Sequence, residues 1–200
     1  MIVLGLTGSV GMGKSTAAAM FKHMGVPVYD ADAAVHRMMQ RGGSAVAAIA
    51  AAFPSVERNG AIDRAALGQR VFGNEPAMKR LEAIVHPRVR QDERAWLAAM
   101  RRRKATLVVM DVPLLFESGR DKRYDAIVVV TAPAFLQRAR VLARPNMTPA
   151  KLAAILARQM PDVEKRRRAD FVVPSGLGRA TTWRGLRAVL ESLLPGIATV

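Results

Sequence analysis

A run of glycines followed by a lysine and two hydroxyl residues stands near the amino terminus. Gly8, Gly13, Lys14 and Ser15 match G-x-x-x-x-G-K-[ST], the pattern of a phosphate-binding loop. Glycine torsions let consecutive N–H groups point at one anion, and the positive end of the following helix dipole adds to this cradle. We expect Lys14 to reach the β- and γ-phosphates of ATP, and the Ser15 hydroxyl to hold Mg²⁺. The residues expected to bind ATP here are Gly8, Gly11, Met12, Gly13, Lys14, Ser15 and Thr16.

Carboxylates follow two further apolar runs. Asp30 and Asp32 come after the run 26–29, and Asp111 ends the run 107–111. Ligands of open α/β sheets sit at the carboxyl ends of the strands, so these groups are candidates for Mg²⁺ or for accepting a proton. Asp30 could also simply cap the helix that follows it, and both roles can hold at once.

Arginines follow the predicted fourth strand. Arg140 and Arg144 lie four residues apart and so face the same side of a helix. In a phosphoryl-transfer enzyme, a closing lid places guanidinium groups over the triphosphate, where they neutralise charge and exclude water. The spacing alone fits a solvated basic helix face equally well.

Apolar strands that alternate with helical segments must position these groups. Such alternation predicts a parallel sheet with helices on both faces. Together with the phosphate-binding motif, it predicts an α/β, P-loop NTPase-type (nucleotide-kinase-like) three-layer fold with a five-stranded parallel sheet. The expected strands are 2–7, 26–29, 107–111, 126–130 and 171–173, and the expected helices include 14–24, 35–53 with a break at 41–43, 63–71, 149–159 and 180–194.

Three smaller features are also predicted between the second and third strands. Ser44, Asp63 and Asn74 are expected to cap helices. His86-Pro87 should end one helix before a longer one runs to about Arg103, because proline breaks helical hydrogen bonding. The segment 54–60 is expected to be a loop.

Composition limits the class of protein. A chain of 200 residues, half of them hydrophobic, is long enough for one full core and too short for two large domains. No cysteine is present, so neither disulfides nor thiolate chemistry is expected. The amino-terminal apolar run is too short for a signal peptide, and no segment approaches the length of a membrane span. We expect a soluble cytoplasmic protein that forms a monomer or a small homo-oligomer.

The formal net charge of +15 raises the question of nucleic-acid binding. Two basic clusters occur at 101–104 and 165–168. The aromatic residues are few, and none interleaves with those clusters as a base-stacking platform requires. We therefore do not expect a nucleic-acid partner; an arginine-rich solvated surface or an anionic small substrate explains the charge equally well.

Over nearly its whole length the chain resembles the dephospho-CoA kinase family, P-loop kinases that phosphorylate the ribose 3′-hydroxyl of dephospho-CoA in the last step of coenzyme A biosynthesis. The phosphate loop alone identifies only the superfamily. The assignment to this family depends on a set of further motifs that occur in the family's order. That set is Leu6-Thr7-Gly8, Asp30-Ala31-Asp32, His86-Pro87, Pro113-Leu114-Leu115-Phe116-Glu117, the spacing of Gln137, Arg140 and Arg144, and Arg158-Gln159.

The resemblance implies roles for these residues. Asp32 would be the base that takes the proton of the 3′-hydroxyl, and Arg140 would belong to the lid. The resemblance also implies a core of 1–33, 104–132 and 169–200, a helical substrate-binding insertion at 34–103, and a lid at 133–168. The implied catalytic residues are Asp32, Lys14 and Arg140, the substrate-binding residues Thr7, Asp32, His86, Leu114, Glu117 and Arg140, the metal ligands Ser15, Asp32 and Asp111, and the further ATP-binding residues Arg144, Ser175 and Gly176.

One departure from the family pattern is visible. The family usually has an asparagine-containing turn after the last strand, where adenine is bound, and this chain has Pro174-Ser175-Gly176 there. A side-chain amide contact with the base is therefore in doubt, while backbone contacts remain available.

Three alternative functions are considered. Another small-molecule kinase would share the loop and lid, but should lack the His-Pro and Pro-Leu-Leu-Phe-Glu segments. A regulatory GTPase would need an Asn-Lys-x-Asp segment, which the sequence lacks. A nucleic-acid-binding module would show salt-dependent binding and no ATP turnover. We expect a phosphotransferase with an alcohol acceptor.

Overall fold

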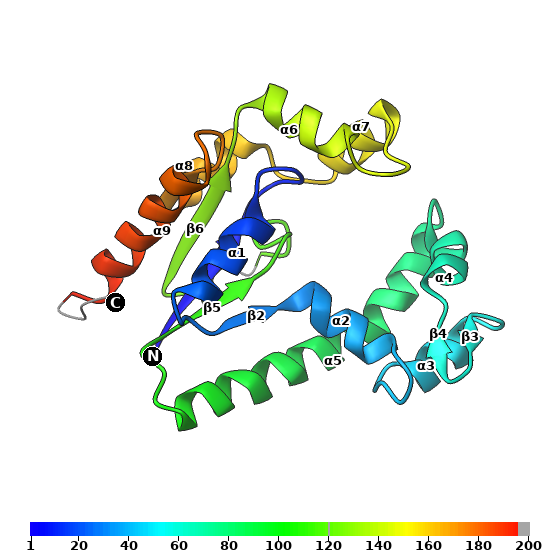
Figure 1. The fold of residues 1–200 in the computed structure, drawn as a ribbon. Coiled ribbons are helices and arrows are strands. Elements are labelled where there is room, and N and C mark those ends of the chain that lie inside the picture. Colours follow the sequence, from blue (N-terminus) through cyan, green and yellow to red (C-terminus); the bar gives the residue numbers. More distant parts are fainter. Residues whose placement is uncertain (120, 196–200) are drawn as a thin grey trace. The chain divides into compact units, whose positions relative to one another are not determined.

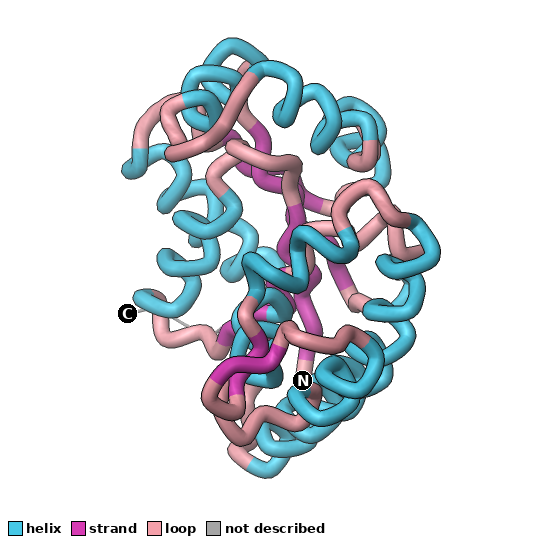
Figure 2. The backbone as a smooth tube through the Cα atoms, turned by 90° about the vertical axis from the view of Figure 1, so that its right-hand side faces the viewer, coloured by secondary structure: helices cyan, strands magenta, loops and turns pink. Residues whose placement is uncertain are grey.

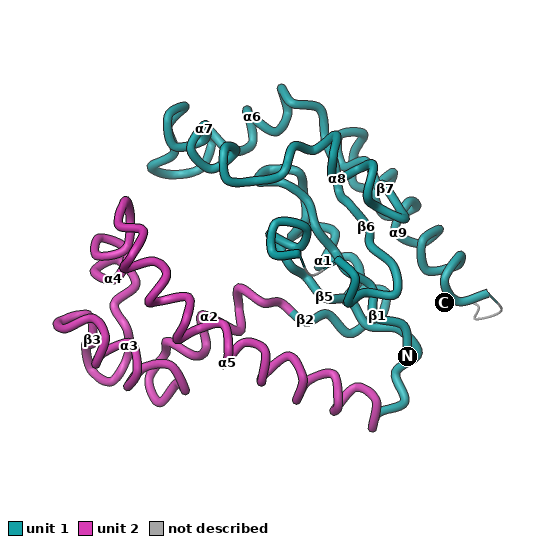
Figure 3. The backbone as a smooth tube through the Cα atoms, turned by 180° about the vertical axis from the view of Figure 1, so that it is seen from behind, with its two compact units in different colours: residues 1–29, 103–200 teal, residues 30–102 magenta. Residues whose placement is uncertain are grey.

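The structure is a computed structural model, and it describes residues 1–119 and 121–195. The chain forms two compact units (Figure 3). The first takes residues 1–29 and the chain from Arg103 onward, and the second takes residues 30–102. The second unit thus begins at Asp30, slightly before the insertion 34–103 that the sequence predicts.

A five-stranded parallel sheet forms the centre of the first unit (Figures 1 and 2). Its order is β2-β5-β1-β6-β7, so β1, which delivers the glycine-rich loop, lies in the middle. β1 pairs in parallel with β5 and β6, and β6 pairs in parallel with β7. This confirms the predicted fold class. The strands are β1 (Ile2–Thr7), β2 (Val28–Asp30), β5 (Leu107–Asp111), β6 (Ala126–Thr131) and β7 (Phe171–Pro174).

Helices cover this sheet because its strands are apolar on both faces. In β6, Val128 and Val130 pack in a cluster with Phe21 of α1 and Leu186 of α9. The alternate residues of β6, Ile127 and Val129, belong to a second cluster, which contains Leu115 and Phe116 of the segment after β5. The helices of this unit are α1 (Lys14–His23), α6 (Ala134–Leu142), α7 (Pro149–Ala157), α8 (Asp162–Arg168) and α9 (Arg179–Leu193), with a 3-10 turn η1 (Asp121–Arg123).

The second unit is mostly helical, as the sequence predicts. Its helices are α2 (Ala31–Met39), α3 (Val46–Ala52), α4 (Arg64–Val71) and α5 (Glu75–Arg102), and a short hairpin pairs β3 (Glu57–Arg58) with β4 (Ala61–Ile62). Val46 and Ile49 of α3 are buried, as is Phe53 directly after it. No helix among residues 1–119 and 121–195 is long and apolar enough to cross a bilayer.

Most of the predicted helix caps are confirmed. The Asp30 carboxylate accepts from Ala33 N at 2.8 Å, and the Asn74 side chain accepts from Ala77 N at 3.1 Å. Asp63 accepts from two backbone N–H groups of α4, and the bond from Ala66 is the main reason that the pKa of this carboxyl is lowered. The cap at Ser44 is wrong: Ala45 takes the N-cap position of α3, with no side-chain bond.

The hairpin β3–β4 lies partly in a segment that the sequence analysis treated as loop. Its turn is Asn59-Gly60, where both residues have positive φ, 53° and 77°. Asn-Gly between two strands is a strong hairpin signal, because a tight primed turn needs positive φ at both central residues. The prediction failed because each strand has only two residues, too few to show alternation.

The predicted break at His86-Pro87 is also wrong. α5 runs without interruption from Glu75 to Arg102 with Pro87 inside it. Proline removes one helical N–H donor, but Val85 and Val89 on either side are buried in the unit. Arg88 also donates through its guanidinium to the Ile84 carbonyl at 2.7 Å. Packing and this side-chain bond therefore hold the helix together across the proline.

Replacing Pro87 by alanine is expected to stabilise the second unit. The Pro87→Ala variant regains an N–H for the carbonyl four residues earlier, and we expect its free energy of unfolding to rise by about 1–3 kcal/mol. Gly68→Ala serves as a matched reference, because a Cβ there meets nothing within 4 Å, and should gain about 1 kcal/mol. Urea unfolding monitored by circular dichroism measures both; a less stable Pro87→Ala variant would contradict this account of α5.

Candidate functional site

The loop after β1 brings its backbone close to two neighbouring segments. A Cβ at Gly8 would lie 2.6 Å from the Val130 carbonyl oxygen, so only glycine fits beside β6. Gly11 and Gly13 have φ of 77° and 91°, a region that side chains disfavour. Gly13 is the N-cap of α1, and Ser15 and Thr16 in the first turn are exposed. The loop therefore has the open, N–H-lined form that binds phosphate groups.

Lys14 and Asp111 form an ion pair at the ends of adjacent elements. The Lys14 ammonium lies 2.5 Å from Asp111 Oδ1, with the two side chains 16% and 6% exposed. Asp111 is the last residue of β5, which lies beside β1 in the sheet. The predicted phosphate-binding cation and a predicted metal ligand are thus in contact. Among the described residues, no cluster of three or more acidic, histidine or cysteine residues forms a ready metal cage.

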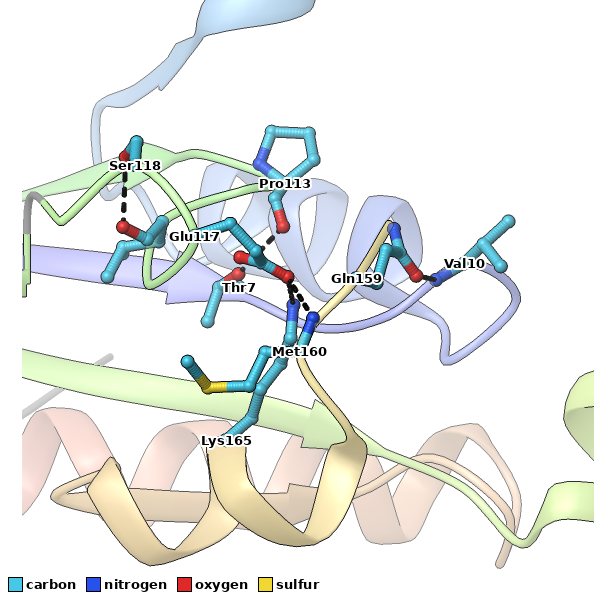
Figure 4. A network of polar contacts seen from close by, with 9 residues as sticks. Thr7, Val10, Pro113, Glu117, Ser118, Gln159, Met160 and Lys165 are labelled. Carbon is cyan, nitrogen blue, oxygen red and sulfur yellow. Dashed lines mark hydrogen bonds and ion pairs between the residues drawn. The ribbon is translucent and has the colours of Figure 1, made fainter. Parts of the chain in front are cut away.

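Two glutamines, Gln159 (Figure 4) and Gln137, hold the peptide groups of Val10 in the middle of the loop. Val10 N donates to Gln159 Oε1 at 3.0 Å, and Gln137 Nε2 donates to the Val10 carbonyl at 2.8 Å. Gln137 belongs to α6 and is buried, and Gln159 follows α7. Both glutamines belong to the family pattern quoted above, but no role could be assigned to them from sequence alone.

Arg140 lies on α6 and joins the loop to the turn after β7. Its guanidinium donates to Ser175 Oγ at 3.0 Å, to the Ser175 carbonyl at 2.8 Å and, more weakly, to the Gly11 carbonyl at 3.4 Å. Ser175 Oγ in turn donates to the Met12 carbonyl at 2.6 Å. Arg140 and Ser175 therefore meet at the loop. Arg144, by contrast, is exposed and follows the end of α6, so the two arginines do not share one helix face.

Packing limits the choice of residue at two glycines of this turn and loop. A Cβ on Gly13 would lie 2.7 Å from Ser175 Oγ, and one on Gly176 would lie 2.8 Å from Pro133 Cδ. Met12 is buried, and its sulfur accepts from Ala132 N at 3.1 Å. The loop, the start of α6 and the turn after β7 are therefore closely packed.

The segment after β5 contains two predicted substrate-binding residues, Leu114 and Glu117, and is contacted by a third, Thr7. Thr7 is fully buried, and its hydroxyl donates to the Pro113 carbonyl at 3.2 Å. Leu114 is 44% exposed, while the next residue, Leu115, is fully buried. Glu117 accepts from Met160 N at 2.7 Å and pairs with Lys165 at 2.8 Å (Figure 4). Of these residues, only Leu114 presents a large exposed surface.

Asp32 and His86 belong to the second unit. Asp32 is exposed in the first turn of α2, two residues after its cap Asp30. His86 is exposed on α5, directly before Pro87. Both side chains are free to meet a ligand from solvent, and their predicted roles stay predictions.

Comparisons with known proteins show the family to which the chain belongs. The family described as dephospho-CoA kinase matches residues 2–177. A dephospho-CoA kinase of Paramagnetospirillum magneticum is 64% identical over 166 residues, which are 83% of this chain and 78% of that protein. A dephospho-CoA kinase of Mesorhizobium japonicum is 55% identical over 193 residues, 96% of this chain and 97% of the relative.

Solved structures show the same fold. A protein from Thermus thermophilus superposes with a TM-score of 0.82 at 36% identity, and the match covers 96% of this chain and 98% of that one. A dephospho-CoA kinase from Campylobacter jejuni has a TM-score of 0.67 at 22% identity, covering 97% and 98% of the two chains, which is a likeness in fold alone.

Removing the Ser175 hydroxyl is expected to weaken nucleotide binding. Ser175→Ala loses the bond to Met12 and one bond from Arg140, so a fluorescent ATP analogue should bind about five- to tenfold more weakly. Ser118→Ala is the control, because that hydroxyl donates to Leu115 within its own turn, and its affinity should stay within about twofold of the parent. Equal affinities of parent and Ser175→Ala would contradict the role of this hydroxyl.

Proposed function

The chain belongs to the dephospho-CoA kinase family, and from this membership we propose that it transfers the γ-phosphoryl group of ATP to the ribose 3′-hydroxyl of dephospho-CoA. The products are coenzyme A and ADP. In this transfer the 3′-oxygen bonds to the γ-phosphorus, the bond from that phosphorus to the β–γ bridging oxygen breaks, and the hydroxyl proton leaves to a base. The observation that carries the proposal is a phosphate loop with Lys14 at its end, in a chain that matches this family over residues 2–177.

ATP would lie along residues 8–16, with its phosphates at the amino end of α1. In that complex Lys14 would exchange its contact with Asp111 for the β- and γ-phosphate oxygens. Such an exchange would keep the Lys14 ammonium paired with an anionic group throughout. The glutamines on Val10 would keep the loop in its open form before ATP arrives.

Magnesium fits the oxygen donors that this site offers. Mg²⁺ prefers hydroxyl, carboxylate and phosphate oxygens, and Ser15 with Asp111 supplies the first two kinds. Asp32 is the third candidate ligand. When bound, the ion would neutralise negative charge on the β- and γ-phosphates. Lys14 and the N–H groups of the loop would share that task from the protein side.

On the acceptor side, we propose Asp32 as the base for the 3′-hydroxyl proton. Its carboxylate is exposed, and it follows β2 at the edge where ligands of such sheets bind. His86 and Leu114 would contact dephospho-CoA, and Arg140 would neutralise charge on the transferred group. The Ser175 contacts already hold the Arg140 guanidinium beside the phosphate loop. Positioning and charge neutralisation would supply most of the acceleration.

A coupled assay with a set of acceptors tests the activity. Purified protein with ATP and Mg²⁺ is given dephospho-CoA, adenosine, nucleoside monophosphates or shikimate, and ADP release is measured. We expect turnover with dephospho-CoA alone and coenzyme A as product. Turnover with another acceptor and none with dephospho-CoA would leave the P-loop kinase fold intact and refute the substrate.

Two neighbouring aspartates make a matched pair for testing the base. Asp32→Asn should lower kcat by about 10²–10⁴-fold with little change in ATP affinity, because general-base catalysis contributes that much. Asp30→Asn should keep most of the activity, because asparagine also caps a helix well. Steady-state kinetics on both variants show which aspartate acts as the base. An unchanged kcat for Asp32→Asn would refute the base assignment.

Lys14→Ala is expected to abolish measurable turnover, because no other side chain of the loop carries a positive charge to the phosphates. A melting temperature close to that of the parent would show that the variant is folded.

A further inference from the structure

Glu117 lies at the centre of a buried polar contact that the reaction scheme does not use (Figure 4). One carboxylate oxygen, Oε1, accepts from Met160 N at 2.7 Å and lies 2.8 Å from the Lys165 ammonium. The other oxygen, Oε2, is buried and has no hydrogen-bond partner among the described residues. The carboxylate thus joins the segment after β5 to the start of α8.

Lys165 differs from the basic residues that follow it. The sequence places it in the cluster 165–168, but its side chain is fully buried, whereas Arg166, Arg167 and Arg168 are exposed. A buried ammonium is costly unless a carboxylate pairs with it, and Glu117 is that partner. Lys165 is fully buried and the Glu117 side chain is only 16% exposed, so water screens their attraction weakly and the pair holds residue 117 in place.

The contact reaches the phosphate loop through two consecutive residues. Glu117 fixes the N–H of Met160, and the preceding residue, Gln159, accepts from Val10 N at 3.0 Å. Met160 also packs in the apolar cluster of Leu115 and Phe116. A shift of Met160 would therefore move Gln159 away from the loop.

We propose that Glu117 and Lys165 are a positioning pair for the phosphate loop: Lys165 holds the Glu117 carboxylate, the carboxylate holds Met160, and Gln159 thereby stays on Val10. In this role Glu117 supports ATP binding and does not contact dephospho-CoA. Its buried, engaged carboxylate favours this role over the substrate contact that the family resemblance implies. This inference rests on the proposed function only for the measurement of KM for dephospho-CoA.

Two uncharged double variants separate the roles. Glu117→Met with Lys165→Met removes both charges and the acceptor for Met160 N, whereas Glu117→Gln with Lys165→Met removes both charges but keeps that acceptor. Methionine and glutamine match the length of glutamate, so both variants keep the packing. Neither leaves an unpaired buried charge, which is the reason for avoiding single variants.

The variant with Glu117→Met and Lys165→Met, here called the methionine pair, should bind a fluorescent ATP analogue about five- to tenfold more weakly than the parent, which corresponds to one lost hydrogen bond. The variant with Glu117→Gln and Lys165→Met, the glutamine pair, should bind the analogue within about twofold of the parent affinity. KM for dephospho-CoA should be unchanged in both. Melting temperatures show that both are folded, and since the two differ in a single side chain, a general loss of stability would affect them alike.

Gln159→Ala supplies a second measurement. Alone it should weaken binding of the ATP analogue about as much as the methionine pair does, and in the methionine-pair background it should add nothing, because both remove the same link. Additive losses would overturn the proposed link. Parent-like ATP binding by the methionine pair would overturn the positioning role, and a loss confined to KM for dephospho-CoA would assign Glu117 to the acceptor.

Failure of the two proposals can be told apart. If the parent protein does not phosphorylate dephospho-CoA, the proposed function fails, whereas the ATP-analogue titrations still report on the positioning pair.

Discussion

The rest of the site depends on how the N–H and carbonyl groups of Val10 are hydrogen-bonded. A phosphate-binding loop must keep its backbone N–H groups open to the ligand, so it cannot satisfy them with regular secondary structure. Here the Val10 N–H donates to Gln159 and the Val10 carbonyl accepts from Gln137, which lie after α7 and in α6, two places in the helical segment between β6 and β7. Segment 133–168 and the loop are thereby joined by direct hydrogen bonds.

Much of this arrangement could be predicted, because it follows from local patterns. The glycine spacing before Lys14 predicts the loop, and apolar runs predict the five strands, since buried parallel strands are apolar on both faces. Asp63 and Asn74 were predicted as caps because their side chains bond to nearby N–H groups. The Asp111 position also follows from strand β5, whose end lies beside β1.

What could not be predicted depends on tertiary packing. Pro87 is a helix breaker by local rules, yet buried neighbours keep α5 continuous. Lys165 has the same sequence surroundings as three exposed arginines, and only its contact with a carboxylate 48 positions earlier explains its burial. The bonds of Arg140 to Ser175 likewise join positions far apart in sequence. No local pattern contains information on such pairings.

The complete burial of Lys165 gives the chain a built-in chemical reporter. An amine reagent cannot reach this ammonium while α8 stays docked, although it reaches an exposed amine such as that of Lys151 at once. Acylation at Lys165 therefore proceeds only through local opening, and the ratio of its rate to that of Lys151 gives the fraction of molecules in which the segment is open, when the two amines have the same intrinsic rate. The equilibrium between docked and undocked α8 can thus be read from a mass spectrum of the unmodified natural sequence.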